Sequence, residues 1–196
     1  MHSNNVLGAV SSLLLSPMSS MAPMAAPLRP NFTAISAHNG SSVFECWQLD
    51  APFSLSSERS VRGSATADLG SLANASFSIY PANYDIGTHT APRKLWAIFL
   101  KGMGLFTLPD DDSASLYVSA GEYGIIFAAD TADISDKGHG THLLGMTEHV
   151  AILIPTEDNE EPAHEVLHSG PCDASEAGGL RELALSGSYS SAIETL

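Results

Sequence analysis

Two groups of histidines carry the residue types in this sequence that are best suited to chemistry. The first is the pentapeptide HEVLH at 164–168, which has the H-E-x-x-H form of a zinc-protease site. That site needs both histidines on one face of a continuous helix, with the glutamate acting as general base on zinc-bound water. Here Gly170 and Pro171 end any helix early, and no histidine follows His168 as a third ligand. We therefore expect a short edge strand or a short helix at 164–168, and no protease.

The second group is formed by His89, His139, His142 and His149, which lie near the ends of expected strands. An inward-facing histidine at the mouth of a small β-barrel can hold a metal ion or move a proton. The alternative for each of them is a structural histidine whose ring is hydrogen-bonded to the backbone. The chemistry of this chain is therefore expected from this second group.

The elements that would position these histidines are short β-strands separated by turn residues. Apolar or alternating runs predict strands at 43–49, 75–82, 94–102, 104–109, 115–120, 123–129 and 149–155. Residues 106–116 are typical of a hairpin with a solvated acidic tip. Because no long amphipathic helix is expected between these strands, the pattern predicts an all-β barrel or sandwich.

One barrel domain is expected at 41–172, with a flexible leader or linker at 1–40 and a C-terminal tail at 173–196. The apolar run at 6–15 fits either a signal peptide or a plain leader, because no lysine or arginine precedes it. The tail is expected to hold one short helix at 180–185. Cytoplasmic and secreted locations both stay open.

The composition argues against several classes of partner. The chain has 196 residues, 44% of them hydrophobic and 15% charged, which suits a folded core rather than a disordered chain. Lys+Arg number 8 against Asp+Glu 22, for a formal net charge of −14. Such an acidic chain is expected to bind neither nucleic acid nor an anionic membrane surface.

The two cysteines, Cys46 and Cys172, lie at either end of the expected barrel. In an oxidising compartment one disulfide would tie the first expected strand to the last, and in a reducing one both would be small buried hydrophobes. Three N-x-S/T sequons, at Asn31, Asn39 and Asn74, are compatible with secretion.

The order of histidines, glycine turns and strands resembles the cupin family over about residues 43 to 172. The first cupin motif is G-x5-H-x-H-x3,4-E-x6-G, and the second is G-x5-P-x-G-x2-H-x3-N. His89 falls on the first histidine of the first motif, with Gly102 as its closing glycine. Ala91 and Leu95 stand where the second histidine and the glutamate belong.

In the second motif, Gly121 matches the opening glycine, but strict spacing puts Ala132 at the ligand position. His139 takes that position only after an insertion spanning 132–138, with His142 as its rival. Half of the family's ligands at most are therefore retained.

The resemblance implies a single cupin-type β-barrel (jelly-roll) in which His89 and His139 are catalytic. It implies that His89, His139 and His142 hold one iron, manganese or zinc ion, or that no metal is bound. The residues that could complete such a set are His149, Glu148 and Glu122. The aromatic residues expected in the pocket wall are Tyr80, Tyr84, Trp96, Phe99 and Phe127.

Within cupins, the sequence is most similar to small single-domain fungal proteins associated with secondary-metabolite pathways, notably reducing polyketide pathways to salicylaldehyde-type products. This likeness implies a tailoring protein for a small hydrophobic polyketide-type intermediate. The reaction would be an oxidation, or a dehydration or isomerisation that leads to an aromatic product. The alternative is a secreted, non-catalytic barrel that binds a small ligand. Besides the small hydrophobic substrate, a second copy of the chain is a possible partner, in a homodimer.

Overall fold

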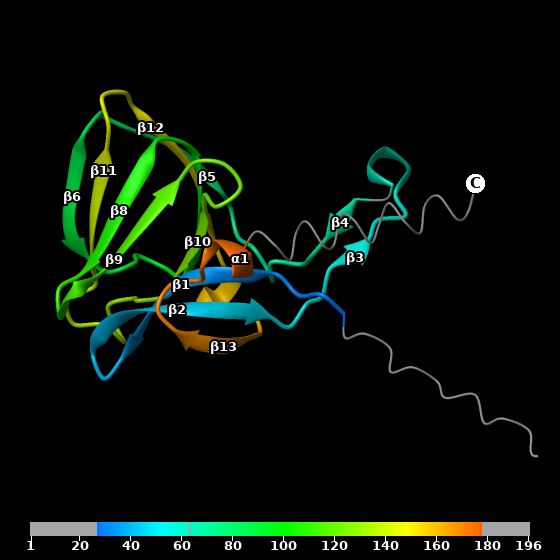
Figure 1. Ribbon diagram of the computed structural model, residues 1–196, viewed down its shortest axis with the longest axis horizontal. Coiled ribbons are helices and arrows are strands. Elements are labelled where there is room, and N and C mark those ends of the chain that lie inside the picture. The colour runs from blue at the N-terminus through cyan, green and yellow to red at the C-terminus, as the bar shows by residue number, and fades with distance from the viewer. Residues whose placement is uncertain (1–26, 63, 178–196) are drawn as a thin grey trace, which may run out of the picture.

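The computed structural model describes residues 27–62 and 64–177 of the chain (Figure 1). Helix is confined in this part to α1 (Ala174–Ala177) and two 3-10 turns, Arg59–Val61 and Glu157–Asn159. The strands are β1 (Asn31–His38), β2 (Ser41–Leu49), β3 (Ser54–Leu55), β4 (Ala65–Thr66), β5 (Ser76–Tyr80), β6 (Tyr84–His89), β7 (Leu95–Lys101), β8 (Met103–Leu108), β9 (Asp111–Ser119), β10 (Ile125–Ala128), β11 (His139–Leu144), β12 (His149–Pro155) and β13 (His164–Ser169).

The eight strands from β5 to β12 form a jelly roll. One sheet contains the order β10-β7-β12-β5, and the sheet that faces it has the order β6-β11-β8-β9. Apart from the β8–β9 hairpin, successive strands alternate between the two sheets, as in two interlocked Greek keys. The all-β prediction is confirmed, and all seven predicted strands are present.

The first sheet is widened to seven strands by β1, β2 and β13, in the order β13-β2-β1-β10-β7-β12-β5. Strand β1 lies within the range predicted as leader or linker, so that prediction is wrong for residues 31–38. It pairs antiparallel with β2 and parallel with β10 and is buried from Asn31 to Ser36. A strand covered on both faces shows no clean alternation of apolar and polar residues, which is why the sequence pattern missed it.

The HEVLH segment is the edge strand β13, which pairs with β2. Of the two structures expected for it, the edge strand is therefore confirmed and the short helix is wrong. The ring of His164 stacks on Trp47 at 3.5 Å, and His168 Nε2 lies 2.9 Å from a Glu176 carboxylate oxygen. These two side chains therefore have structural contacts of their own, in a strand rather than in the helix that a zinc protease needs.

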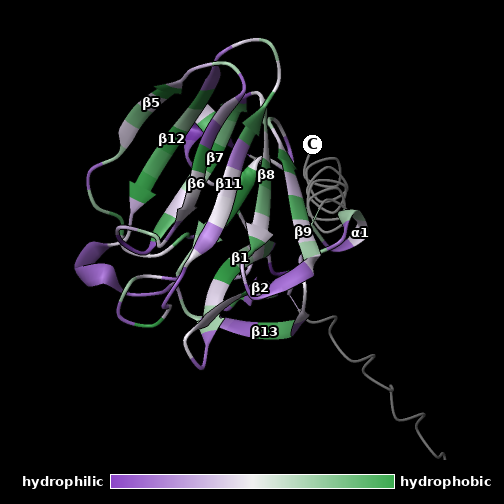
Figure 2. Cartoon of the chain, turned by 90° about the vertical axis from the view of Figure 1, so that its left-hand side faces the viewer, coloured by the Kyte–Doolittle hydropathy of each residue, from purple (hydrophilic) through white to green (hydrophobic). Residues whose placement is uncertain are grey.

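Two apolar clusters lie on opposite faces of the seven-stranded sheet. The larger one lies between the two sheets and includes Phe99, Phe106 and Leu143. The other is aromatic, with Phe32, Trp47, Trp96 and Phe127, and the Nε1 of Trp96 donates to the Leu69 carbonyl at 3.1 Å. Figure 2 shows hydrophobic residues along the strands of both sheets.

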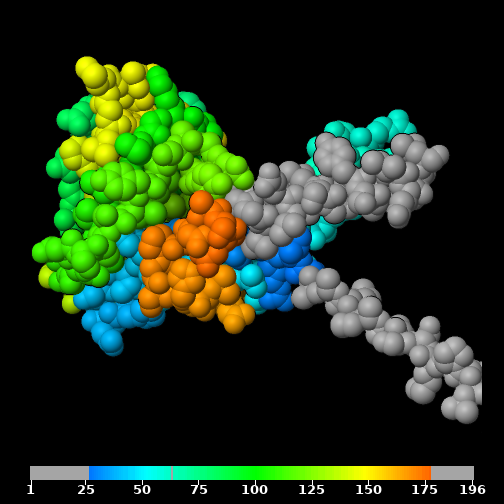
Figure 3. Space-filling view, viewed as in Figure 1, coloured from blue at the N-terminus to red at the C-terminus, as the bar shows by residue number. Residues whose placement is uncertain are grey.

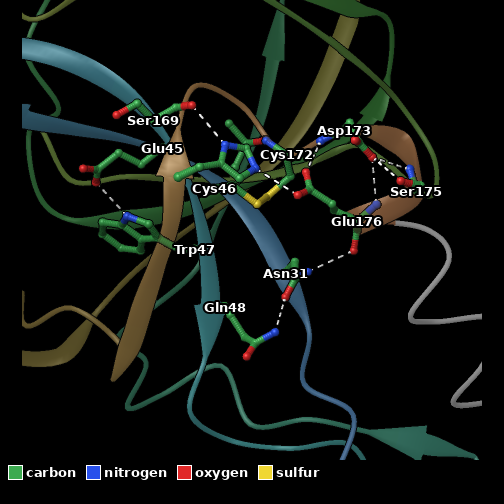
Figure 4. The surroundings of a disulfide bond; sticks show 12 residues. Asn31, Glu45, Cys46, Trp47, Gln48, Ser169, Cys172, Asp173, Ser175 and Glu176 are labelled. Atoms are coloured by element: carbon green, nitrogen blue, oxygen red, sulfur yellow. Dashed lines mark hydrogen bonds and ion pairs between the residues drawn. A yellow bond between two sulfur atoms is a disulfide. The ribbon is translucent and has the colours of Figure 1, made fainter.

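A disulfide joins Cys46 in β2 to Cys172 beyond β13, which is the pairing expected for an oxidising compartment (Figure 4). The C-terminal end of the described chain thereby packs against the N-terminal strands (Figure 3). Beside it, the buried Asn31 donates to the Glu176 carbonyl at 3.2 Å, so this sequon is closed to glycosylation in the folded protein. Asn39 and Asn74 are exposed.

The predictions for a signal peptide and for a helix at 180–185 concern residues 1–26 and 178–196, outside the described part of the chain. Within that part, no helix has the length and apolar character needed to cross a membrane.

Candidate functional site

A cavity of about 260 Å³ lies between the two sheets of the jelly roll. His89 and His139 both line it, so the structure brings the two predicted catalytic residues together. The lining residues that reach solvent include Ile86, His89 and Pro92, which places the mouth of the cavity on their side. Most of the remaining wall is apolar.

His139 is paired with a buried carboxylate. It is the first residue of β11, and its Nδ1 lies 2.7 Å from Asp130 Oδ2 on the segment that leaves β10. His139 is 4% exposed and Asp130 is fully buried, so water does not weaken the interaction between them. Because a carboxylate oxygen only accepts hydrogen bonds, the His139 Nδ1 carries the proton, and in the neutral ring Nε2 keeps a free lone pair.

A chain of hydrogen bonds holds Asp130 from the other side. The Ser42 hydroxyl donates to the same Asp130 Oδ2 at 2.7 Å. The hydroxyls of Ser42 and Ser135 are 2.8 Å apart, and the Gly138 N–H donates to Ser135 Oγ at 2.9 Å. Since the Ser42 proton is already given to Asp130, Ser135 must donate to Ser42. All donors therefore point toward Asp130, and the chain fixes the tautomer of His139.

His89 faces His139 directly across the β6–β11 ladder, with ring centroids 4.7 Å apart. Its Nδ1–H donates to the Gly87 carbonyl at 3.1 Å, which leaves Nε2 as the unprotonated nitrogen of the neutral ring. Burial, and then the neighbouring His139, lower the pKa of His89 below its ordinary value. His89 is therefore neutral at pH 7.

Gly138 permits this close approach of the two histidines. It has a φ of 74°, and a Cβ at this position would overlap the carbonyl oxygen of His89. A larger residue at 138 would therefore push β6 away from the start of β11.

Only some of the aromatic residues predicted for the pocket wall line the cavity. Phe99 and Tyr80 line the cavity, whereas Tyr84, Trp96 and Phe127 do not. Trp96 and Phe127 belong to the aromatic cluster on the opposite face of the sheet, and Tyr84 is 42% exposed. Side chains alternate between the two faces of a strand, so Leu95, Ala97 and Phe99 point into the barrel and Trp96 points out.

The same alternation corrects the prediction for His142. In β11 the buried positions are His139, Thr141 and Leu143, and His142 faces away from the cavity, with Nε2 3.2 Å from Asn83 Oδ1. His149 is buried outside the cavity lining, where its Nε2–H donates to the Leu144 carbonyl at 2.7 Å.

The described residues do not fit the predicted metal site. Only two of its three histidines share the cavity, Asp130 contacts the far nitrogen of His139, and Glu148 is bound to Lys101 at 2.6 Å. The one grouping of three ligand-type residues in the described chain includes Cys46 and Cys172, whose sulfurs are already joined. Metal ions of this class need three or more protein ligands, so two imidazoles do not make a resident site.

Three polar residues of the site were not predicted from the sequence. Asp130 contacts His139, and Ser42 contacts Asp130 from a position 88 residues earlier in the chain. Thr141 lines the cavity two residues after His139, and its buried hydroxyl has no partner among the described residues. The available signal was the position of Asp130 directly after a buried strand, together with the i, i+2 spacing of His139 and Thr141.

No protein-family model and no curated protein matches the chain. Among solved structures, a cupin-like protein of Thermotoga maritima is similar over 76% of this chain and 93% of its own, with 13% identity and a TM-score of 0.31. The sugar epimerase NovW of Streptomyces spheroides is similar over 74% and 78%, with 10% identity and a TM-score of 0.31.

The capsular polysaccharide assembling protein CapF of Staphylococcus aureus is similar over 71% of this chain, which spans only 34% of CapF, with 14% identity and a TM-score of 0.34. Values this low transfer neither an activity nor a substrate. The strand order of the chain itself is that of the double Greek key on which cupins are built. The chain has a cupin-type jelly roll. In this cupin-type barrel, the groups that could do chemistry are the histidines that line the cavity.

Proposed function

We propose that the protein catalyses proton transfer on a small hydrophobic substrate, as an isomerase or dehydratase, with His139 as the general base. The observation that carries this proposal is the 2.7 Å contact between His139 Nδ1 and the buried Asp130. A carboxylate behind an imidazole orients the ring and stabilises the positive charge that forms when Nε2 takes a proton. The apolar wall around it supports a hydrophobic substrate.

The proposed dehydration starts on a β-hydroxy ketone. His139 Nε2 removes the proton next to the carbonyl, and the electron pair of that C–H bond moves to the carbonyl oxygen as an enolate. The enolate then expels the β-hydroxyl group, which leaves as water with the proton that His139 returns. An enone and a neutral histidine remain, so the step needs no oxidant. In an isomerisation, His139 returns the proton to another carbon instead.

The proposal includes the setting expected from the sequence, in which the substrate is a polyketide-type intermediate. A cyclised polyketide that loses water becomes conjugated and then aromatic, which suits a proton-transfer site in an apolar cavity. Of the two reactions predicted from the sequence, we propose dehydration or isomerisation rather than oxidation. The reason is that the described cavity presents a base and its carboxylate but not a set of metal ligands.

The test uses 3-hydroxycyclohexanone, whose dehydration to the enone is followed by ultraviolet absorbance. We expect the wild-type chain to accelerate dehydration, and His139→Gln to lose this acceleration by about hundredfold or more. His142→Gln is the matched control on the opposite face of β11 and should keep the wild-type rate. Wild-type activity retained by His139→Gln would overturn the proposal. So would a wild-type protein that neither dehydrates the ketone nor exchanges its α-protons with deuterated water.

The second candidate is the secreted binding protein without catalysis, which the Cys46–Cys172 disulfide favours. It predicts binding of cyclic ketones with no proton exchange, and equal binding by the wild type and by His139→Gln.

A further inference from the structure

Three alanines on the seven-stranded sheet create the space of the cavity. Ala97 in β7, Ala128 in β10 and Ala151 in β12 all line it and are 7%, 7% and 1% exposed. Each lies beside large residues in the sheet: Ala97 pairs with Ile126 and Leu153, Ala128 with Leu95 and Ile35, and Ala151 with Phe99. The small side chains thus leave a depression in an otherwise bulky apolar layer.

The polar groups of the cavity lie on the opposite sheet. His89 in β6 and His139 and Thr141 in β11 face these alanines across the barrel. No lysine, arginine, aspartate or glutamate is among the described residues that line the cavity. A ligand therefore meets hydrogen-bonding groups on one side and hydrocarbon on the other.

We infer that Ala97, Ala128 and Ala151 are specificity-determining residues that size the cavity for a compact, neutral ring compound of roughly ten non-hydrogen atoms. Its oxygen-bearing edge lies toward His89, His139 and Thr141, and its ring lies on the alanines. This inference deepens the proposed function by naming the substrate class of the same site.

The size follows from the cavity volume. An apolar cavity of about 150 Å³ holds benzene, which corresponds to roughly 25 Å³ for each non-hydrogen atom. The volume of about 260 Å³ then holds roughly ten such atoms. That is a single substituted ring or two fused small rings.

The charge and polarity follow from the lining. A carboxylate or phosphate would enter the barrel without a cationic partner, and burying an unpaired charge is strongly unfavourable. A sugar would leave several hydroxyl groups without hydrogen bonds against the alanine side. One oxygen-bearing group can be accommodated: a ligand hydroxyl can donate to the free Nε2 of a histidine, and a ligand carbonyl can accept from the unpartnered Thr141 hydroxyl.

The test is binding of 1-indanone, a neutral bicyclic ketone of ten non-hydrogen atoms, measured by titration calorimetry or by ligand-observed NMR. Ala97→Leu adds three carbon atoms, roughly 75 Å³, and should weaken binding of 1-indanone at least tenfold while the smaller cyclohexanone still binds. Ala132→Leu, at an exposed position outside the cavity, is the matched control and should bind 1-indanone like the wild type. 4-Methylbenzoate, which also has ten non-hydrogen atoms but carries a negative charge, should not bind.

Ala151→Val, with two added carbons, provides the same comparison should Ala97→Leu fail to fold. Wild-type affinity for 1-indanone in both folded variants, or equal binding of the ketone and the carboxylate, would overturn the inference. No catalytic turnover enters this measurement. If the alanine variants lose binding but His139→Gln keeps the dehydration rate, the substrate class stands and the proposed reaction fails.

Discussion

Replacement of Asp130 by asparagine separates the charge behind His139 from the geometry that the carboxylate provides. Ser42 and His139 both donate to the same oxygen of Asp130, so an asparagine would place its carbonyl oxygen there and keep both hydrogen bonds. The tautomer of His139 is then unchanged. The negative charge beside the protonated ring is lost, and the amide NH2 takes the place of Oδ1, which is buried without a partner among the described residues.

The expected size of the effect follows from the distance of 2.7 Å between Nδ1 and Oδ2. Two unit charges at this distance attract by about 6 kcal/mol at an effective dielectric constant of about 20. The charge of an imidazolium is shared between its two nitrogens, so we take roughly half of this, about 3 kcal/mol. Asp130→Asn should therefore slow proton transfer by about a hundredfold.

The assay is the dehydration of 3-hydroxycyclohexanone at saturating and at low substrate concentration. The loss should fall on kcat, because Asp130 contacts His139 and lies outside the cavity lining where the substrate binds. Asp136→Asn, an exposed carboxylate on the same segment, is the matched control and should leave kcat unchanged. A folded Asp130→Asn variant whose kcat stays within about threefold of wild type would refute the reasoning, because about 1 kcal/mol or less would then come from the carboxylate.

Three further predictions concern the scaffold of the site. Gly138→Ala should lower the free energy of unfolding in urea by more than about 1 kcal/mol, because its Cβ would overlap the His89 carbonyl; an unchanged denaturation midpoint would contradict this. Reduction of Cys46–Cys172, which lie 126 residues apart, should cost about 4–5 kcal/mol of stability in urea titrations with and without dithiothreitol, and coincident curves would argue against it. The pKa of His89 is lowered in the folded protein, so the unfolded chain binds this proton more readily and the unfolding free energy should fall as the pH drops below 6.5. His89→Gln should flatten that pH dependence, and an unchanged slope would show that His89 does not cause it.

The fold could be predicted because most of its longer strands have a hydrophobic pattern that identifies them in the sequence. The runs at 94–102 and 149–155 are apolar or alternating and are bounded by glycine and proline, and both are strands of the jelly roll. The strands β6 and β11 that carry the two histidines were missed. They are short and rich in glycine, histidine and threonine, so no alternating apolar run identifies them.

The candidate site could be predicted only in part, because the sequence shows where a strand lies but not which face is inward. His139 and His142 are three residues apart in one strand and therefore face opposite ways. Trp96 likewise faces away from the cavity, because its neighbours Leu95 and Ala97, one residue away on either side, line it. Once the faces are known, the choice among histidines and aromatics follows directly.

Asp130 could not be found from spacing at all. It meets Ser42 only because β1 and β2 are added to the edge of the jelly roll, and β1 was expected to be linker. Strand β1, one of the strands that the sequence pattern missed, thus places β2 and its Ser42 beside Asp130.

The departures from the cupin metal motif and the apolar cavity belong to one arrangement. Ala91 and Leu95, at the places where that motif has a histidine and a glutamate, both line the cavity. Positions that would offer ligands to a metal therefore offer hydrocarbon to a substrate. Of the matched ligand positions, His89 and His139 keep a ring nitrogen, and Asp130 occupies the second nitrogen of His139. The proposed base therefore lies in an apolar cavity, which is the environment that the proposed removal of a proton from carbon requires.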